Sequence, residues 1–172
     1  MHTTAAPERT EAADYYFTYI SQVPSGDVRE ILAAQLPETL AVLYGVTELQ
    51  SIERYAPGKW SIRQVVAHLS DTERLFVFRA LWFARGFDSP LPSFDQDVAI
   101  ATCDAEHRSF RSLVAEFRTV REATVTFFQS LPEDAWMRHG IASGNPFSVR
   151  ALAFISAGHL AHHLRILREK YL

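Results

Sequence analysis

The sequence is poor in cysteine and lysine and has no long apolar run. Cys103 is the only cysteine in 172 residues, which excludes an internal disulfide and a thiolate-rich zinc site. Lysine supplies only 2 of the 17 basic residues, the net charge is −3 and no basic patch stands out, so we expect no nucleic-acid partner. No segment approaches the roughly 18 consecutive apolar residues of a transmembrane helix, so we expect no membrane association.

The amino-terminal segment contains proline, threonine and charged residues but lacks the apolar core of a signal peptide. Together with the scarcity of cysteine, this predicts a cytoplasmic protein. We expect residues 1–11 to form a flexible tail. Residues 12–172 have about the length of one domain, and with 48% hydrophobic residues the chain can build a sizeable core.

Apolar residues recur at helical spacing along the chain, and neither strand-like alternation nor an Asn-Gly or Asp-Gly turn interrupts them. Asp27 is a predicted N-cap, and Ser61 with Gln64 forms a predicted capping box. Pro37 predicts either a kink or two abutting helices. The expected helices span residues 12–22, 28–44, 62–85, 110–131 and 148–171, with a short helical piece near 95–102.

Four of these helices are long and amphipathic, which predicts an all-α fold built as a four-helix bundle. Residues 86–106 join the second and third bundle helices and are too many for a tight antiparallel turn. We therefore expect a long crossover, or a segment that covers one end of the bundle. Residues 132–147 contain two glycines and two prolines, and we expect an irregular link there.

Three histidines fall on predicted buried helix faces. His159 and His163 are four residues apart, so they share one face of the last helix with about 6 Å between them. The adjacent His162 turns toward the polar side and is expected at the rim. His68 lies near the middle of an apolar face of the second bundle helix, among Val65, Thr72, Leu75, Phe76, Arg79 and Phe83.

A lone buried histidine usually bonds to a carbonyl or a hydroxyl group. Three inward imidazoles are different, because a divalent metal ion satisfies three acceptor nitrogens at once. The spacing therefore predicts a metal site formed by His68, His159 and His163, with coordination positions left open. A metal-free bundle with a histidine hydrogen-bond network is the alternative from the spacing alone.

Other chemistry is weakly represented. The sequence has no glycine-rich phosphate loop, no Gly-x-Ser-x-Gly turn and no His-Glu-x-x-His motif. Asp71 and Glu73 follow His68 closely, but neither is a convincing general acid or base. We expect surface positions for the remaining histidines, His2, His107 and His139.

Several motifs in the observed order resemble the DinB/YfiT-like family of metalloenzymes, over roughly residues 27–172. They are Tyr55-Ala-Pro-Gly-Lys-Trp-Ser-Ile62 leading into Val66-Ala-His-Leu-Ser-Asp-Thr-Glu73, then Pro90-Leu-Pro-Ser-Phe-Asp-Gln-Asp97, and finally Gly158-His-Leu-Ala-His-His-Leu164. The resemblance implies a DinB-like four-helix bundle with a long crossover, a homodimer, and metal ligands at His68, His159 and His163. One departure is Leu160, where many relatives carry an acidic residue.

The resemblance also implies a function. Zinc is the first metal expected, with nickel or another transition metal as alternatives. The metal would activate a low-molecular-weight thiol or water toward a small electrophile, as in a thiol S-transferase or a hydrolase. The alternative is a non-catalytic metal-binding or stress-related module. Polar pockets beside the metal, formed by residues 86–106 or 132–147, would favour the enzyme, whereas an aromatic seal would favour the module.

Overall fold

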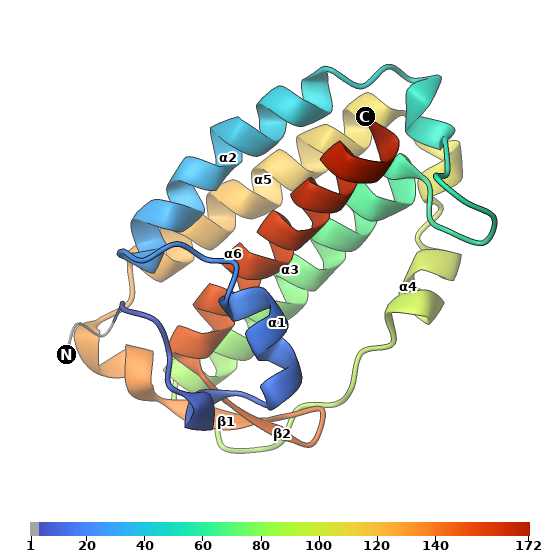
Figure 1. The fold of residues 1–172 in the computed structure, drawn as a ribbon. Coiled ribbons are helices and arrows are strands. Elements are labelled where there is room, and N and C mark those ends of the chain that lie inside the picture. Colours follow the sequence, from blue (N-terminus) through green and yellow to red (C-terminus); the bar gives the residue numbers. More distant parts are fainter. Residues whose placement is uncertain (1–3) are drawn as a thin grey trace.

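Four long helices lie side by side in the structure, a computed structural model that describes residues 4–172 (Figure 1). Helices α2 and α3 are diagonal to each other, because each contacts both α5 and α6. The predicted helical fold and four-helix bundle are confirmed.

Among the described residues, no helix is both long and apolar enough to cross a membrane. The bundle helices are α2 (Val28–Tyr44), α3 (Ile62–Ala84), α5 (Phe110–Gln129) and α6 (Val149–Ile166).

The connection between α3 and α5 sets the topology. Helices α3 and α5 run in one direction and α2 and α6 in the other (Figure 1), so the chain must return along the whole of α3 before α5 begins. The 23 residues of α3 extend about 35 Å. Residues 85–95 can span about 36 Å when extended, which is just enough. The short helix α4 (Gln96–Thr102) follows, and the expected long crossover is confirmed.

Side-chain caps begin the helices where the sequence predicts. Asp27 accepts a hydrogen bond from the backbone of Arg29 at the start of α2. Ser61 and Gln64 form the predicted capping box of α3. Helix α2 is continuous through Pro37, so two abutting helices are not formed.

A β-hairpin occupies part of the segment that was expected to be irregular, and that prediction is wrong. Strands β1 (His139–Ala142) and β2 (Asn145–Ser148) pair antiparallel. The two turn residues, Ser143 and Gly144, have φ angles of 52° and 73°. Positive φ at both positions is typical of a type I′ turn, whose twist suits a hairpin. The Ser-Gly dipeptide was the available signal, although it is weaker than Asn-Gly.

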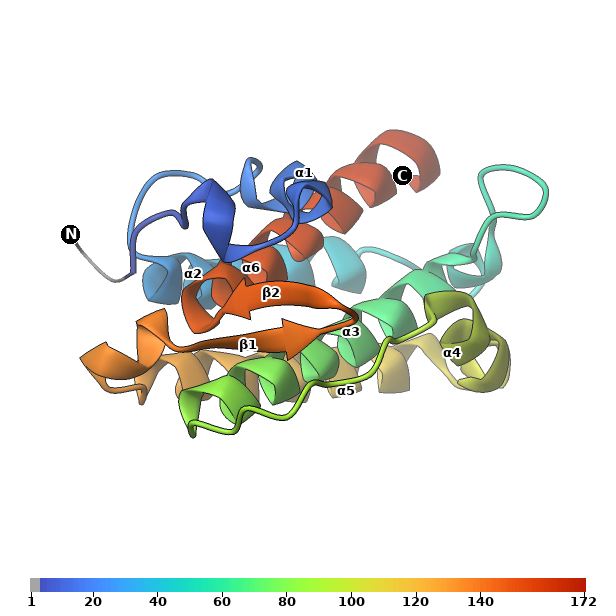
Figure 2. The same cartoon turned by 90° about the horizontal axis from the view of Figure 1, so that it is seen from below.

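The hairpin lies across one end of the bundle and holds the crossover (Figure 2). The backbone N–H of Leu91 donates to the carbonyl of Ile141 at 2.9 Å, and that of Ser143 donates to the carbonyl of Leu91 at 3.1 Å. The start of the crossover is therefore paired with β1 before the chain continues to α4.

The amino-terminal segment packs against α6. Glu11 accepts hydrogen bonds from Arg150 and from the hydroxyl of Ser148. The expected helix at 12–22 consists of a 3₁₀ turn and the short helix α1 (Phe17–Ile20). The division into a tail at 1–11 and one domain at 12–172 stays a prediction. The 3₁₀ turns are Arg9–Glu11, Asp14–Tyr16, Gln50–Ile52, Ala105–His107 and Glu133–Met137, and a π-helical turn at Leu167–Tyr171 follows α6.

The core has two apolar clusters with buried polar residues between them. One cluster gathers near the hairpin and includes Phe83, Trp136 and Phe147. The other lies toward the opposite end of the bundle and includes Ile62 and Phe117. Along α3 and α6, five buried polar residues lie where the two clusters meet, and we call them the polar layer: His68, Ser70, Thr72, Glu73 and His159.

Gly158 allows α1 to rest directly on α6. A Cβ atom at this position would lie 2.1 Å from the carbonyl oxygen of Tyr19 and 2.5 Å from its carbonyl carbon. Backbone atoms cannot move aside as the end of a long side chain can. Although glycine weakens a helix interior, it is required here because the backbone of α1 occupies the space of a side chain.

We predict that Gly158→Ala lowers the free energy of unfolding by about 1–3 kcal/mol, because overpacking against Tyr19 outweighs the gain in helix propensity. Urea denaturation measures the change. The matched control is Gly45→Ala, whose new Cβ would come no closer than 3.3 Å to another atom and should change stability by less than about 0.5 kcal/mol. A Gly158→Ala protein as stable as the wild type would contradict the close contact.

Candidate metal centre

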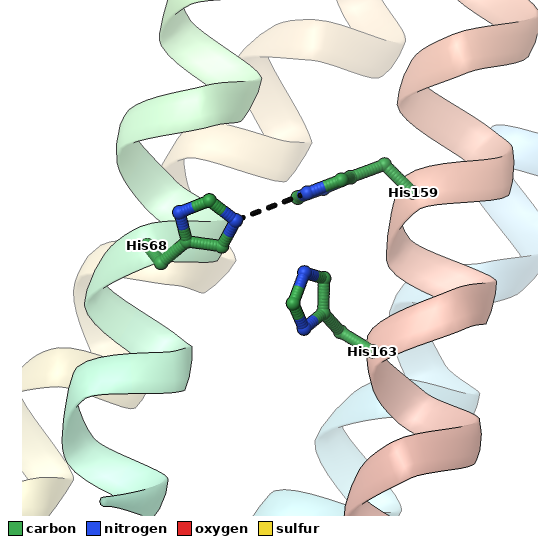
Figure 3. Close-up of side chains that lie close together, drawn as sticks. All are labelled: His68, His159 and His163. Carbon is green, nitrogen blue, oxygen red and sulfur yellow. Dashed lines mark hydrogen bonds between the residues drawn. The ribbon is translucent and has the colours of Figure 1, made fainter. Parts of the chain in front are cut away.

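The structure brings together the three histidines selected from the sequence. His68 extends from α3, and His159 and His163 extend from successive turns of α6. The Nε2 atoms of His68 and His159 are 3.1 Å apart, and one nitrogen from each of the three rings lies within 4.8 Å of the others. Figure 3 shows the three rings pointing into a shared space between α3 and α6.

Burial keeps these imidazoles neutral. His68 and His159 expose only 2% and 6% of their surfaces, and His163 is half-buried. Burial lowers the pKa of His68 to about 4. Burial, together with the neighbouring His68 and His162, lowers the pKa of His163 to about 3. The pKa of His159 also falls well below its usual value, chiefly through burial. At neutral pH each ring therefore keeps one nitrogen lone pair that can bind a metal ion.

Thr72 selects the tautomer of His159. Its hydroxyl donates to the carbonyl of His68 at 2.7 Å, which leaves its lone pairs to face Nδ1 of His159 at 3.5 Å. A proton on Nδ1 leaves the Nε2 lone pair directed at His68. Leu160 is buried in an apolar cluster and offers no polar group to the site. Thr72 thus offers His159 a hydrogen-bond acceptor, which Leu160 cannot provide.

The triad fits a divalent metal ion. Zinc binds imidazole nitrogen at about 2.0–2.1 Å, so two nitrogens on a tetrahedral ion are separated by about 3.3 Å. The 3.1 Å between His68 and His159 is close to this value, and the third nitrogen needs to move by at most about 1.5 Å. Among the described residues, Nδ1 of His163 is buried without a hydrogen-bond partner, so no protein group satisfies this nitrogen.

The other described histidines lie outside the triad, although His162 borders it, with its ring centroid 5.2 Å from that of His163. His162 is half-buried, with its ring edge-on to Tyr19 and its Nδ1 3.5 Å from Arg165. His107 and His139 are exposed, as expected. His2 lies outside the described residues.

Neither acidic candidate on α3 faces the triad as an acid or base. Asp71 pairs with Arg74 at 3.4 Å. Glu73 is buried and lies 2.8 Å from Arg121 of α5, which is completely buried. Burial raises the pKa of Glu73, and the positive charge of Arg121 opposes that rise. Gln35 of α2 contacts Arg121 at 3.4 Å and donates to the carbonyl of Ala157 on α6 at 2.9 Å.

Two pockets reach the triad from different sides. The His163 pocket, of about 280 Å³, has Asp97 in its lining, and the His159 pocket, of about 210 Å³, has Gln96. Consecutive residues of α4 therefore contribute one to each pocket. A larger groove of about 830 Å³ lies between α2 and α5, and none of the three histidines lines it. The His163 pocket is also lined by Tyr55, Gly58, Lys59, Trp60, Val65, Ile166 and Tyr171.

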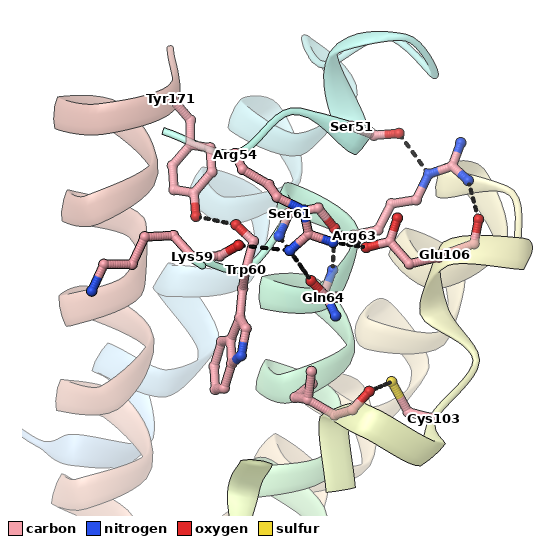
Figure 4. A network of polar contacts seen from close by, with 11 residues as sticks. Ser51, Arg54, Lys59, Trp60, Ser61, Arg63, Gln64, Cys103, Glu106 and Tyr171 are labelled. Carbon is pink, nitrogen blue, oxygen red and sulfur yellow. Dashed lines mark hydrogen bonds and ion pairs between the residues drawn. The ribbon is translucent and has the colours of Figure 1, made fainter. Parts of the chain in front are cut away.

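Trp60 forms the wall between His68 and the His163 pocket. Its ring centroid lies 4.8 Å from that of His68. The hydroxyl of Tyr171 donates to the Trp60 carbonyl at 2.6 Å, and Arg54 donates to the carbonyl of Lys59 at 2.6 Å (Figure 4). These bonds fix the loop before α3. Further bonds in the same network join Ser51, Ser61, Arg63, Gln64 and Glu106.

Aromatic rings enclose His159 on the opposite side. The ring centroids of Tyr19 and Phe76 lie 5.3 Å and 5.7 Å from that of His159. Tyr19 was not identified from the sequence, because only the folding of α1 onto α6 brings it there. The nearest clue is Gly158 beside His159, which permits the close approach.

Comparisons with known proteins agree with this arrangement. A family model described as the DinB superfamily matches residues 31–167. A protein of Geobacillus thermodenitrificans (strain NG80-2), named as a presumed metal-dependent hydrolase, is 25% identical over 150 residues, which cover 83% of this chain and 83% of that protein. The solved structure of YfiT from Bacillus subtilis superposes with a TM-score of 0.64 at 17% identity, over 98% of this chain and 97% of that chain. Its description is a presumed metal-dependent hydrolase with an unusual four-helix bundle topology.

We predict that metal-free wild-type protein carries the His159 proton on Nδ1, because Thr72 accepts it. Thr72→Val should move at least about half of the population to the Nε2 tautomer, since a buried donor without a partner costs about 1–3 kcal/mol. Long-range ¹H–¹⁵N NMR of the imidazole rings measures the tautomer. Thr72→Ser keeps the hydroxyl and should behave as wild type. A wild-type ring protonated on Nε2 would rule out the role given to Thr72.

Proposed function

The chain belongs to the DinB superfamily, and we propose that it is a metal-dependent enzyme whose metal ion is held by His68, His159 and His163. The observation that carries the proposal is the convergence of three neutral imidazoles, of which His163 lines one pocket and His159 another. The similarity to a presumed metal-dependent hydrolase supports a divalent metal. Imidazole ligands suit several such ions, and we propose zinc first and nickel or another transition metal second.

A divalent ion with three protein ligands keeps open positions and lowers the pKa of a bound water or small thiol. The protein side chains create the surroundings for that chemistry. Trp60, Tyr19 and Phe76 exclude bulk water around the rings, which strengthens electrostatic interactions. The His163 pocket adds charged groups of both signs, Lys59 and Asp97.

The pocket linings support an enzyme over a non-catalytic module. Gln96 and Asp97 from the crossover and Ser143 from the hairpin turn all line pockets that contain a triad histidine. Aromatic rings cover parts of the triad without closing either pocket. We propose hydrolysis of a small molecule as the leading reaction, because it is the reaction named for the relative. Transfer of a low-molecular-weight thiol to a small electrophile is the alternative.

Other expectations from the sequence stay predictions. They are the homodimer, the cytoplasmic location and the absence of a nucleic-acid partner.

We predict that the purified protein binds one divalent metal ion per chain and that each of His68→Ala, His159→Ala and His163→Ala weakens the affinity at least about 100-fold. Competition titration against a chromogenic chelator measures the affinity. The matched control is His162→Ala, which removes the adjacent imidazole outside the triad and should change affinity less than about threefold. Full metal retention by the triple variant would refute the ligand assignment.

Turnover tests the reaction. The metal-loaded protein should hydrolyse small activated esters, or transfer cysteine to a small electrophile, at least about tenfold faster than chelator-treated protein. His159→Ala should lose this excess, and His162→Ala should keep it. Rates that are equal with and without metal in both assays would exclude the proposed enzyme.

A further inference from the structure

Arg79 on α3 is a buried cation without an acidic partner. Only 2% of its surface is exposed, and among residues 4–172 no carboxylate lies within ion-pair distance of it. A guanidinium group stays protonated at neutral pH. Removing such a charge from water is costly unless an opposite charge is nearby. Arg121 and Arg150 are also buried, but each of them forms an ion pair with a glutamate.

The hydrogen bonds of Arg79 leave part of the guanidinium unused. Its Nη2 atom donates to the carbonyl of Pro92 at 3.2 Å and to the hydroxyl of Ser143 at 2.8 Å. Both acceptors are neutral, and Tyr16 also hydrogen-bonds to the Arg79 side chain. The Nε atom is buried and has no hydrogen-bond partner among the described residues. A planar guanidinium has five N–H donors, so donors remain for a further acceptor.

Arg79 and His159 line the same pocket. Arg79 is eleven residues beyond His68 on α3, so both side chains project from nearly the same face, with about 16 Å of helix between their Cα atoms. Side chains on a helix lean toward its amino terminus, which directs Arg79 back toward the triad. No acidic residue lines this pocket. Its other lining residues are Tyr15, Tyr16, Tyr19, Leu75, Phe76, Phe94, Gln96 and Ser143.

We propose that the His159 pocket binds the carboxylate group of a small organic acid through Arg79. One unpaired guanidinium matches a single negative charge, and because Nη2 already donates twice, the remaining N–H groups of Arg79 are the donors available to a carboxylate oxygen. A volume of about 210 Å³ suits a molecule of few heavy atoms. The substrate of the proposed enzyme is therefore a small carboxylic acid derivative, with its carboxylate at Arg79 and its reactive part beside the triad. This last step rests on the proposed function, but carboxylate binding does not.

Binding of butyrate to the full-length, chelator-treated protein tests the proposal, because no metal ion can then hold the carboxylate. Isothermal titration should show saturable binding of butyrate and at least about tenfold weaker binding of butyramide, which has a similar shape but no charge. Equal binding of the two compounds, or no binding of butyrate, would overturn the proposal. A protein that binds butyrate but no metal would overturn only the proposed enzyme.

Two variants distinguish an Arg79 that binds an anion from an Arg79 that only holds the hairpin turn in place. Arg79→Met removes the charge and should weaken butyrate binding at least about tenfold. Asn145→Ala removes a hydrogen bond within the hairpin turn, from the Asn145 side chain to the carbonyl of Ser143, at a residue outside the pocket lining, and should change binding less than about threefold. Equal losses in the two variants would show that Arg79 acts by holding the hairpin turn and would overturn the proposal.

If Arg79→Met fails to fold, NMR of the arginine side chains in the wild-type protein tests whether butyrate binds at Arg79. Butyrate should shift the Nε–H signal of Arg79 in the wild-type protein in step with the titration curve, and butyramide should not. An Arg79 signal unchanged at saturating butyrate would place the ligand elsewhere.

Discussion

The ion pair between Glu73 and Arg121 is the interaction on which the arrangement of the helices depends. Glu73 belongs to α3, Arg121 to α5, and Gln35 of α2 connects Arg121 to the backbone of α6 at Ala157. Each bundle helix thus contributes one group to a single buried polar chain. Removing one partner of such a pair leaves an uncompensated charge, which typically costs 3–5 kcal/mol. The axial positions of α3 and α6 are therefore restricted near the level where His68 meets His159.

The polar layer divides the core and gives the triad its chemical character. Apolar clusters lie on both sides of it along α3 and α6. They remove water from the histidines, which depresses the imidazole pKa values and keeps the lone pairs available. The same burial is unfavourable for Nδ1 of His163, which has no hydrogen-bond partner among the described residues. The buried histidines thus lower the free energy of unfolding of the metal-free bundle, and the same histidines are positioned to bind a cation.

The sequence predicted the features that depend on local patterns. The bundle helices could be located from their caps at Asp27 and Ser61 and from the helical spacing of their apolar residues. The same spacing predicted that His159 and His163 share one face of a helix. The hairpin was missed because its strands have four residues each and its turn uses Ser-Gly.

Contacts made only in the folded molecule could not be read from the pattern. Nothing in the sequence around Tyr19 indicates that it covers His159, and the lack of an acidic partner for Arg79 appears only once its neighbours are placed. The polar pairing of Glu73 was likewise hidden, because helical phase alone left its direction undecided.

The wide spacing of the triad in the chain has a consequence for biosynthesis. His68 and His159 are separated by 91 residues. At ribosomal rates of about 5–20 residues per second, roughly 5–20 s pass between the synthesis of the first histidine and that of the other two. In this interval the nascent chain contains only one of the three proposed ligands, and a single imidazole holds a transition metal weakly. The three-histidine site therefore forms only when α6 packs against α3. The metal that binds is then chosen by competition among the ions present where the protein folds.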